Sequence, residues 1–305
     1  MNDSFREKAQ ILNEFVLKIA AMALMFCDHL GLFLLSYLGS NNVAGLILRA
    51  AGRLAFPLFA FMLAEGMRKT RSKGRYILRL TIMWALVAAA QVILFYGFHA
   101  KEIQTSYNAF ADLILGALFI YCLSLQGWKK SLAALPVLAI GASYGLQICL
   151  FNEILSISSF PFFLLPGYSL FGFALILGFY YSKNLVDAIS GKYLAGGGQS
   201  LEAFQETRSY QSLMNFMAVT ALFVVTLIGW GISYLPAPIN FDVVTMQAVN
   251  AGTVGQTWCL LAAIFLFLYN GKRGPDGNAF RIVSYAFYPM HIAVLFLAFL
   301  LIFGY

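Results

Sequence analysis

Residues 14–38 read EFVLKIAAMALMFCDHLGLFLLSYL, an apolar run with the ionisable pair Asp28-His29 near its middle. About 20 mostly apolar residues are enough for a helix to cross the hydrocarbon core of a bilayer. The run is longer than the apolar part of a cleavable signal peptide, and no cleavage site of the A-x-A type follows it. We therefore expect residues 14–38 to remain in the protein as its first membrane helix.

The composition extends this interpretation to the whole chain. Hydrophobic residues make up 61% of the sequence and charged residues 11%, whereas about one quarter of a soluble domain is charged. The net charge of +7 comes from lysines and arginines at the ends of apolar runs, as the positive-inside rule requires. These features exclude a soluble domain and argue against nucleic acid as a partner. They predict a multi-pass protein surrounded by membrane lipids.

Further apolar runs predict an all-α polytopic integral membrane protein with a single transmembrane domain over residues 1–305. We count about nine candidate helices, within a range of about eight to ten. The number of helices varies because Pro161, Pro166 and Gly167 divide the stretch 131–181. The candidates are 14–38, 44–67, 76–98, 109–125, 131–150, 164–181, 213–233, 253–270 and 281–303.

The loops between these candidates alternate in charge. Basic segments follow the second, fourth, sixth and eighth helices, so the N-terminus is predicted to be cytoplasmic and the C-terminus to lie outside. The longest loop, 182–211, is then cytoplasmic. Its Gly196-Gly197-Gly198 lacks the Lys-Ser/Thr of a phosphate-binding loop, and we interpret it as a flexible linker.

No metal site is predicted from the cysteines. The chain has four cysteines and three histidines. Each cysteine lies in an apolar stretch, and none forms a CxxC pair or stands at metal-ligand spacing from a histidine. We interpret the cysteines as small buried hydrophobic residues.

Ionisable residues inside the candidate helices indicate a site. Each costs at least about 2.5 kcal/mol at the centre of a bilayer, so each needs a partner, water or a function. From the helical rise, His29 and Arg53 lie roughly 20 Å, and His291 roughly 15 Å, from the predicted cytoplasmic side. Three such groups in one layer predict a polar cavity shared by the first, second and last helices.

Two prolines strengthen this prediction. Pro57 cannot donate to the carbonyl of Arg53, and Pro289 cannot donate to the carbonyl of Tyr285. Free carbonyls at membrane depth are tolerated only against protein or a wet cavity. Both helices are therefore expected to kink beside a charged residue.

Each of these residues also has a structural interpretation. Asp28 and His29 point about 100° apart on a helix, so Asp28 is expected to pair with Arg49 or Arg53, which share one face. That ion pair could be purely structural, and His29 and His291 could be packing residues.

The remaining polar groups carry the same two interpretations. Glu65 is expected to form a surface pair with Arg68 or Lys69, while Asn108 and Asp112 are expected to cap a helix or make a local polar contact. The basic run 68–79 sets topology and contacts lipid headgroups, or it binds an anionic cofactor.

Several stretches resemble the TraX family, described as conjugal-transfer pilin acetylases. LKIAAMALMFCDHLG (17–31) is similar to its first helix, LRAAGRLAFPLFAFMLAEG (48–66) to its second and FYPMHIAVL (287–295) to its last. YILRLTIMWALVAAAQ (76–91) and YNAFADLILGAL (107–118) fit more loosely. The acidic residue that the family often has before a Tyr-Gly-x-x-Gly-like piece is absent from LPGYSLFGF (165–173).

The resemblance implies a bacterial cytoplasmic (inner) membrane acetyltransferase. Acetyl-CoA would come from the cytoplasm, and an acceptor amine or hydroxyl on a protein N-terminus, glycan or small molecule would be reached from the membrane or the outer side. His29 would be the general base or carry the acetyl group, Arg53 would stabilise the oxyanion or grip the donor, and Asp28 would hold an arginine. His291 would transfer a second proton or orient the donor. The predicted substrate and cofactor site contains Arg49, Glu65, Arg68, Lys69, Arg71, Lys73, Arg75, Asn108, Asp112 and Tyr288.

Two other functions stay open at this point. Ionisable residues at the membrane midplane and broken helices also mark transporters and lipid-handling proteins, although no inverted repeat is visible. A membrane scaffold without catalysis would need the same residues only for folding.

Overall fold

The computed structural model describes residues 10–99, 103, 107–151, 153–155, 157, 160–195, 200–235, 246, 254–275 and 277–303. These residues fold into helices, and an isolated parallel bridge joins Leu12 to Tyr269. In chain order the elements are α2 (Glu14–Leu38), α3 (Val43–Gly52), α4 (Ala55–Lys69), α5 (Lys73–Val92), η1 (Ile93–Gly97), α6 (Ala109–Leu123), η3 (Gly127–Ala133), α7 (Ala134–Phe151), η4 (Phe162–Leu164), α8 (Ser169–Ala195), α9 (Leu201–Gln205), α10 (Arg208–Ile232), η5 (Gln256–Ala262), α11 (Ala263–Phe267) and α12 (Asn278–Phe303).

The multi-pass, all-α architecture is confirmed. Among the described residues, seven helices are long and apolar enough to cross a membrane. Two shorter apolar helices, Ala109–Leu123 and Gln256–Phe267, fall on the fourth and eighth predicted spans, so nine crossings require these two as well. Large apolar side chains such as Leu78, Ile82 and Leu86 are exposed along α5, as expected for a helix that faces lipid.

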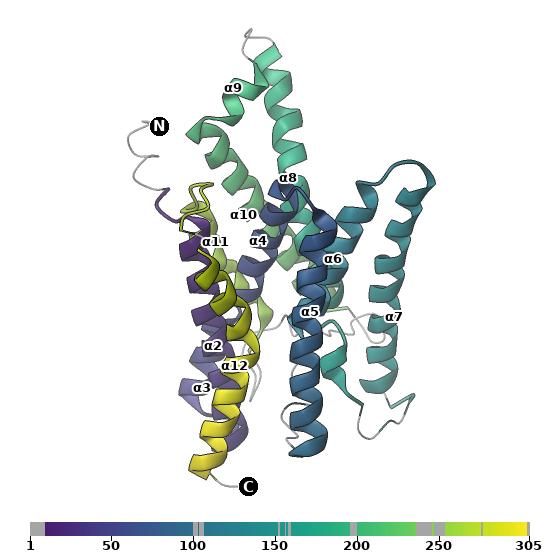
Figure 1. The fold of residues 1–305 in the computed structure, drawn as a ribbon, viewed down its shortest axis with the longest axis vertical. Helices are drawn as coiled ribbons and strands as arrows, with labels where there is room; N and C mark the ends of the chain where they lie inside the picture. The colour runs from purple at the N-terminus through teal and green to yellow at the C-terminus, as the bar shows by residue number, and fades with distance from the viewer. Residues whose placement is uncertain are drawn as a thin grey trace.

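The first and last helices, α2 and α12, run side by side in the same direction (Figure 1). Phe15 packs on Phe280 near the starts of the two helices, and Tyr37 packs on Phe303 near their ends. If both helices span the membrane, the start of α2 and the end of α12 lie on opposite sides. The chain must then cross an odd number of times.

The second predicted span corresponds to Val43–Lys69, which is interrupted within its length. α3 ends at Gly52 and α4 begins at Ala55, so the interruption lies where the kink beside Arg53 was predicted. Pro57 is the third residue of α4, in the first turn, where a missing N–H costs no helical hydrogen bond. In a continuous helix its ring would clash with the carbonyl of Arg53. The chain therefore turns at Arg53 and Leu54.

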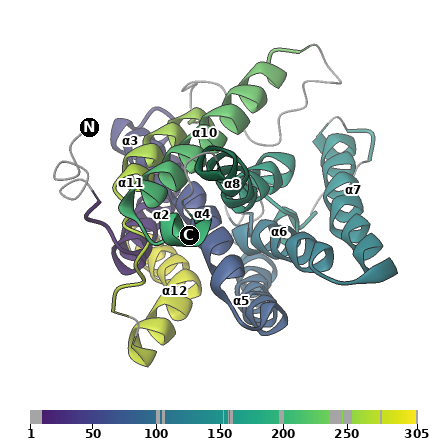
Figure 2. The same cartoon turned by 90° about the horizontal axis from the view of Figure 1, so that it is seen from above.

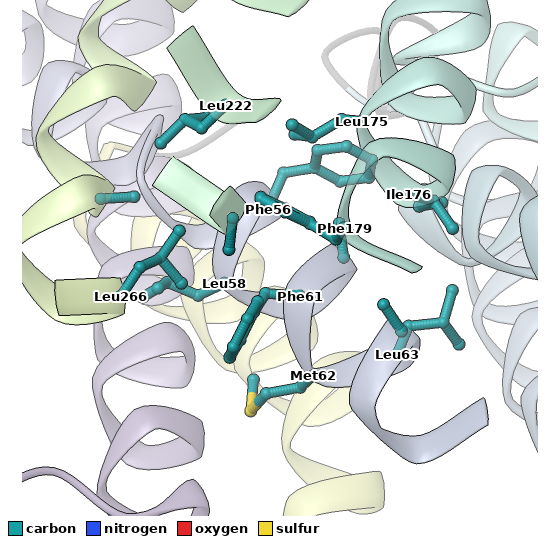
Figure 3. Packing of buried hydrophobic residues seen from close by; sticks show 14 of the residues in the cluster. Phe56, Leu58, Phe61, Met62, Leu63, Leu175, Ile176, Phe179, Leu222 and Leu266 are labelled. Atoms are coloured by element: carbon teal, nitrogen blue, oxygen red, sulfur yellow. The ribbon is translucent and has the colours of Figure 1, made fainter. Parts of the chain in front are cut away.

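Helix α4 lies at the centre of the bundle, and most of its side chains are buried. Its apolar residues pack with those of α8, α10 and α11, including Phe61, Phe179, Leu222 and Leu266 (Figure 3). Figure 2 shows α12 and α5 beside α4, and α7 at the periphery beyond α6. The core therefore fixes one side of α4, while α2 packs on another.

The described residues of the predicted loop 182–211 are largely helical. α8 continues to Ala195, α9 covers Leu201–Gln205, and α10 begins at Arg208. Asp187 stabilises this extension, because it pairs with Lys183 at 2.5 Å and accepts hydrogen bonds from Gln205 and from the hydroxyl of Tyr210. The triplet Gly196–Gly198 lies outside the described residues.

Candidate functional site

A cavity of about 890 Å³ opens along α2 and reaches from the start of that helix to its middle. Its deep end, the floor, is lined by Asp28, His29, Arg49, Arg53 and Tyr168. Its other end, the basic rim, is lined by Lys18, Lys69, Arg71, Arg79 and Arg273. The walls between floor and rim are apolar, with Met25, Phe59 and Leu63 among them. The cavity thus joins a cationic mouth to a polar interior.

The ion pair at the floor joins Asp28 to Arg49. Nη1 of Arg49 lies 2.6 Å from Oδ2 of Asp28, and both side chains are mostly buried. Of the two partners that the sequence allowed, Arg49 is therefore the one in direct contact. A glycine makes this possible, because a Cβ on Gly52 would lie 2.3 Å from Cβ of Asp28. The absence of that atom lets α2 and α3 approach closely at the floor.

The two predicted histidines meet across α2 and α12. Nε2 of His291 lies 3.1 Å from Nδ1 of His29. Each Nδ1 also faces a carbonyl one turn earlier in its own helix, at 3.0 Å from Met25 for His29 and 2.8 Å from Phe287 for His291. His291 is 5% exposed and lies behind His29, which itself lines the cavity.

These contacts assign the tautomers of the neutral rings. The short contact with the carbonyl of Phe287 requires a proton on Nδ1 of His291, so its Nε2 is an acceptor. His29 must then donate from Nδ1, with Met25 O and His291 Nε2 as acceptors. Nε2 of His29 carries the lone pair and has no hydrogen-bond partner among the described residues. The pair thus presents an unprotonated ring nitrogen beside the cavity, as a general base requires.

Arg53 reaches the same cavity from the break between α3 and α4. Its Nε is buried without a hydrogen-bond partner among the described residues. The carbonyl that Pro57 leaves free accepts a hydrogen bond from Nε2 of Gln256, at 3.3 Å. Gln256 belongs to η5 and is 1% exposed. The backbone at Arg53 is thus held while its guanidinium has no acidic partner at ion-pair distance in the described chain.

Tyr168 completes the floor from the start of α8. Its ring stacks on Phe56, with centroids 3.6 Å apart and planes at 13°. Asp112 on α6 accepts hydrogen bonds from the backbone N–H groups of Gly167, Tyr168 and Ser169, at 2.7 to 3.3 Å. Asp112 therefore caps α8 rather than binding in the cavity, which it does not line.

Asn108 and Glu65 do not line the cavity. Asn108 caps its own helix by accepting from Phe110 N at 3.1 Å, and its Nδ2 donates to the carbonyl of Trp84 at 3.2 Å. Glu65 pairs with Arg68 and, at 2.7 Å, with Lys69. This pair was expected at the surface, but Glu65 is 8% exposed because α4 is surrounded by other helices. The charge of Glu65 is thus neutralised by its own helix.

The residues of the predicted basic run lie in different places. Lys69 and Arg71 line the cavity. Arg68 instead donates to the carbonyls of Phe179 and Tyr180 on α8, at 2.7 and 2.9 Å. Arg75 lines a second, smaller hollow that shares Arg71 and Arg79 with the rim, and Lys73 lines neither space. Tyr288 lines the cavity, with its ring edge-on to His29.

Sequence reasoning did not single out Tyr168, Gln256 or Tyr107 as site residues, although all three line the cavity. The quoted piece LPGYSLFGF contains Tyr168, and its aromatic ring beside Pro166 and Gly167 was the available signal. Tyr107 lies just before α6, and burial raises the pKa of its hydroxyl to about 12. Among the described residues, no three His, Cys, Asp or Glu side chains are grouped to hold a metal ion.

One comparison with known proteins found a match. The sequence model of the family described as TraX protein matches residues 14–187, from the start of α2 into α8. No curated protein and no solved structure matches the chain. The match covers the floor of the cavity and most of its rim, but not α12.

Proposed function

Because the chain belongs to the TraX family, we propose that this membrane protein is an acetyltransferase of the bacterial cytoplasmic membrane. It would move an acetyl group from cytoplasmic acetyl-CoA to an acceptor amine or hydroxyl, reached from the membrane or the outer side. The observation that carries the proposal is the cavity itself, which joins the basic rim to an unprotonated imidazole nitrogen. In the predicted topology the rim faces the cytoplasm, where acetyl-CoA is found.

The rim and the cavity suit the donor. The diphosphate and phosphate of CoA are anions, and the rim residues Lys18, Lys69, Arg71, Arg79 and Arg273 supply cations at the mouth. The apolar walls suit the flexible arm that carries the thioester. Its length would bring the acetyl group to the floor while the nucleotide stays at the rim.

The reaction follows from the groups at the floor. Nε2 of His29 accepts the proton of the acceptor as its nitrogen or oxygen attacks the thioester carbonyl. The carbon–sulfur bond breaks, the new carbon–nitrogen or carbon–oxygen bond forms, and the proton passes to the leaving CoA thiolate. Arg53 stabilises the oxyanion that develops on the carbonyl. His291 fixes the tautomer of His29, and Asp28 holds Arg49 in place.

Label transfer tests this proposal. The purified protein in lipid nanodiscs would receive acetyl-labelled acetyl-CoA and a bacterial membrane extract as the source of acceptor. We expect labelled acceptor and free CoA thiol from the wild type, and a rate roughly 10²–10⁴-fold lower from His29→Ala. His99→Gln is the control, because His99 is exposed and does not line the cavity.

Two results would overturn the proposal. Equal turnover in the wild type and His29→Ala would remove His29 from the reaction. Absence of turnover together with absence of CoA binding, measured as no change in melting temperature at millimolar CoA, would favour the transporter or lipid-handling alternative.

A further inference from the structure

We propose that Tyr168 is a further catalytic residue, whose hydroxyl donates a hydrogen bond to the acetyl carbonyl oxygen at the floor, and that Asp112 is its positioning residue. The inference rests on the proposed function, because it names an additional group in the same reaction. Three observations carry it: the place of the ring, the backbone contacts that fix it, and the unused hydroxyl.

Packing between α8 and α4 fixes the position of the Tyr168 ring. It lies nearly parallel to Phe56 of α4, with centroids 3.6 Å apart. Gly172 follows one turn later on α8, and a Cβ there would lie 2.7 Å from Cβ of Tyr168 and 2.8 Å from Cζ of Phe56. The stack therefore exists only because residue 172 has no side chain. It aligns Tyr168 beside the break that carries Arg53.

Hydrogen bonds to Asp112, in addition to packing, fix the backbone around Tyr168. Asp112 is 2% exposed, and its two carboxylate oxygens accept from three successive N–H groups. Ser169, the last of the three, has φ of +46°, a left-handed conformation that costs a non-glycine residue free energy. The hydrogen bond from Ser169 N to Oδ1 of Asp112, at 2.7 Å, offsets this cost. Backbone strain of this kind clusters at active sites and ligand clamps.

The hydroxyl of Tyr168 is available to a ligand. Tyr168 lines the cavity, and its hydroxyl has no hydrogen-bond partner among the described residues. Asp28, Arg49 and Arg53 line the same floor. Arg49 already donates to Asp28, so Tyr168 and Arg53 are the donors left at the floor. A neutral O–H donor beside a cation, in a site of low dielectric, is the arrangement that stabilises an oxyanion.

The test compares Tyr168→Phe with Tyr193→Phe. The first variant keeps the stack on Phe56 and removes only the hydroxyl, while Tyr193 is an exposed tyrosine at the other end of α8. We expect Tyr168→Phe to lower kcat for label transfer about 10²-fold, as the loss of one oxyanion donor does. The Kd for CoA, measured by calorimetry, and the melting temperature should not change, because the lost contact acts on the transition state.

Asp112→Asn tests the positioning role. We expect kcat to fall while the Kd for CoA is kept, and the double variant with Tyr168→Phe should lose no more than Tyr168→Phe alone. Additive losses would give Asp112 a merely structural role and overturn that half of the inference. Equal kcat in the wild type and Tyr168→Phe would overturn the catalytic half and leave the proposed function intact. A wild type that neither binds CoA nor transfers acetyl would overturn both.

Discussion

Asp28 and His29 are adjacent in the chain, yet each contacts a different helix. Asp28 pairs with Arg49 of α3, and His29 hydrogen-bonds His291 of α12. Neighbours on a helix point about 100° apart, so one dipeptide joins α2 to two partners. At the residue scale, the floor of the cavity is built around this dipeptide.

The hydrogen bond between His29 and His291 can be tested by removing and then partly restoring it. His291→Ala removes the acceptor that fixes the tautomer of His29, so we expect the acetyl-transfer rate to fall by about 10²-fold. His291→Gln should recover part of that loss, because its amide oxygen can accept from Nδ1 of His29. Initial rates and melting temperatures of both variants would check this. Identical rates in the two variants, with folding intact, would mean that the hydrogen bond has no part in the reaction.

The ion pair between Asp28 and Arg49 is expected to contribute to the unfolding free energy. Asp28→Asn leaves Arg49 without its counterion, and we expect a loss of about 3–5 kcal/mol in unfolding free energy. The double variant Asp28→Leu with Arg49→Met should regain most of it, because an apolar pair replaces two buried charges. Thermal melts in one detergent would measure both. A double variant that also kept full acetyl-transfer activity would show that the pair is purely structural.

At the element scale, α2 and α3 pack closely through small residues. Cβ atoms on Gly31 or Gly45 would lie within 3.0 Å of the facing helix, as would one on Gly52. Such small-residue contacts are how membrane helices approach one another. The hairpin they form sets the distance between His29 and Arg53.

Gly52→Ala tests this packing. The added Cβ would overlap Asp28, so we expect the unfolding free energy to fall by about 1–3 kcal/mol. Gly145→Ala on α7 is the matched control, because nothing lies within 4 Å of its added Cβ. A helix interior favours alanine over glycine, so the control should melt at the same temperature or higher. Equal melting of the two variants would contradict the close approach of α2 and α3.

The sequence could predict the elements better than their contacts. Apolar runs and basic loops give the spans, and Pro57 indicated a disturbed helix, because these signals are local. The cost of burying His29, Arg53 and His291 also predicted a shared cavity. The contact between Asp112 and Tyr168 joins residues 56 positions apart, and nothing local in either segment requires it. Gln256 was missed for the same reason, because its partner is a carbonyl of a distant helix.

At the scale of the whole molecule, α2 and α12 are parallel, so the start of α2 and the end of α12 lie at opposite ends of the bundle (Figure 1). We expect the N-terminus in the cytoplasm and the C-terminus outside. Single cysteines replacing Lys130 and introduced after Phe303, in a chain with the native cysteines removed, would report this. A membrane-impermeant thiol reagent should label the first only from the cytoplasmic side and the second only from the outside. Labelling of both from one side would contradict the nine-crossing topology, which places five predicted spans between the two positions.

The most direct measurement is an experimental structure of the protein with a non-hydrolysable acetyl-CoA analogue. We expect the nucleotide at the basic rim and the carbonyl at the floor, within hydrogen-bond reach of Arg53 or Tyr168 and next to Nε2 of His29. An analogue bound outside the cavity, or imidazoles of His29 and His291 that lie apart and face lipid, would contradict the proposed function.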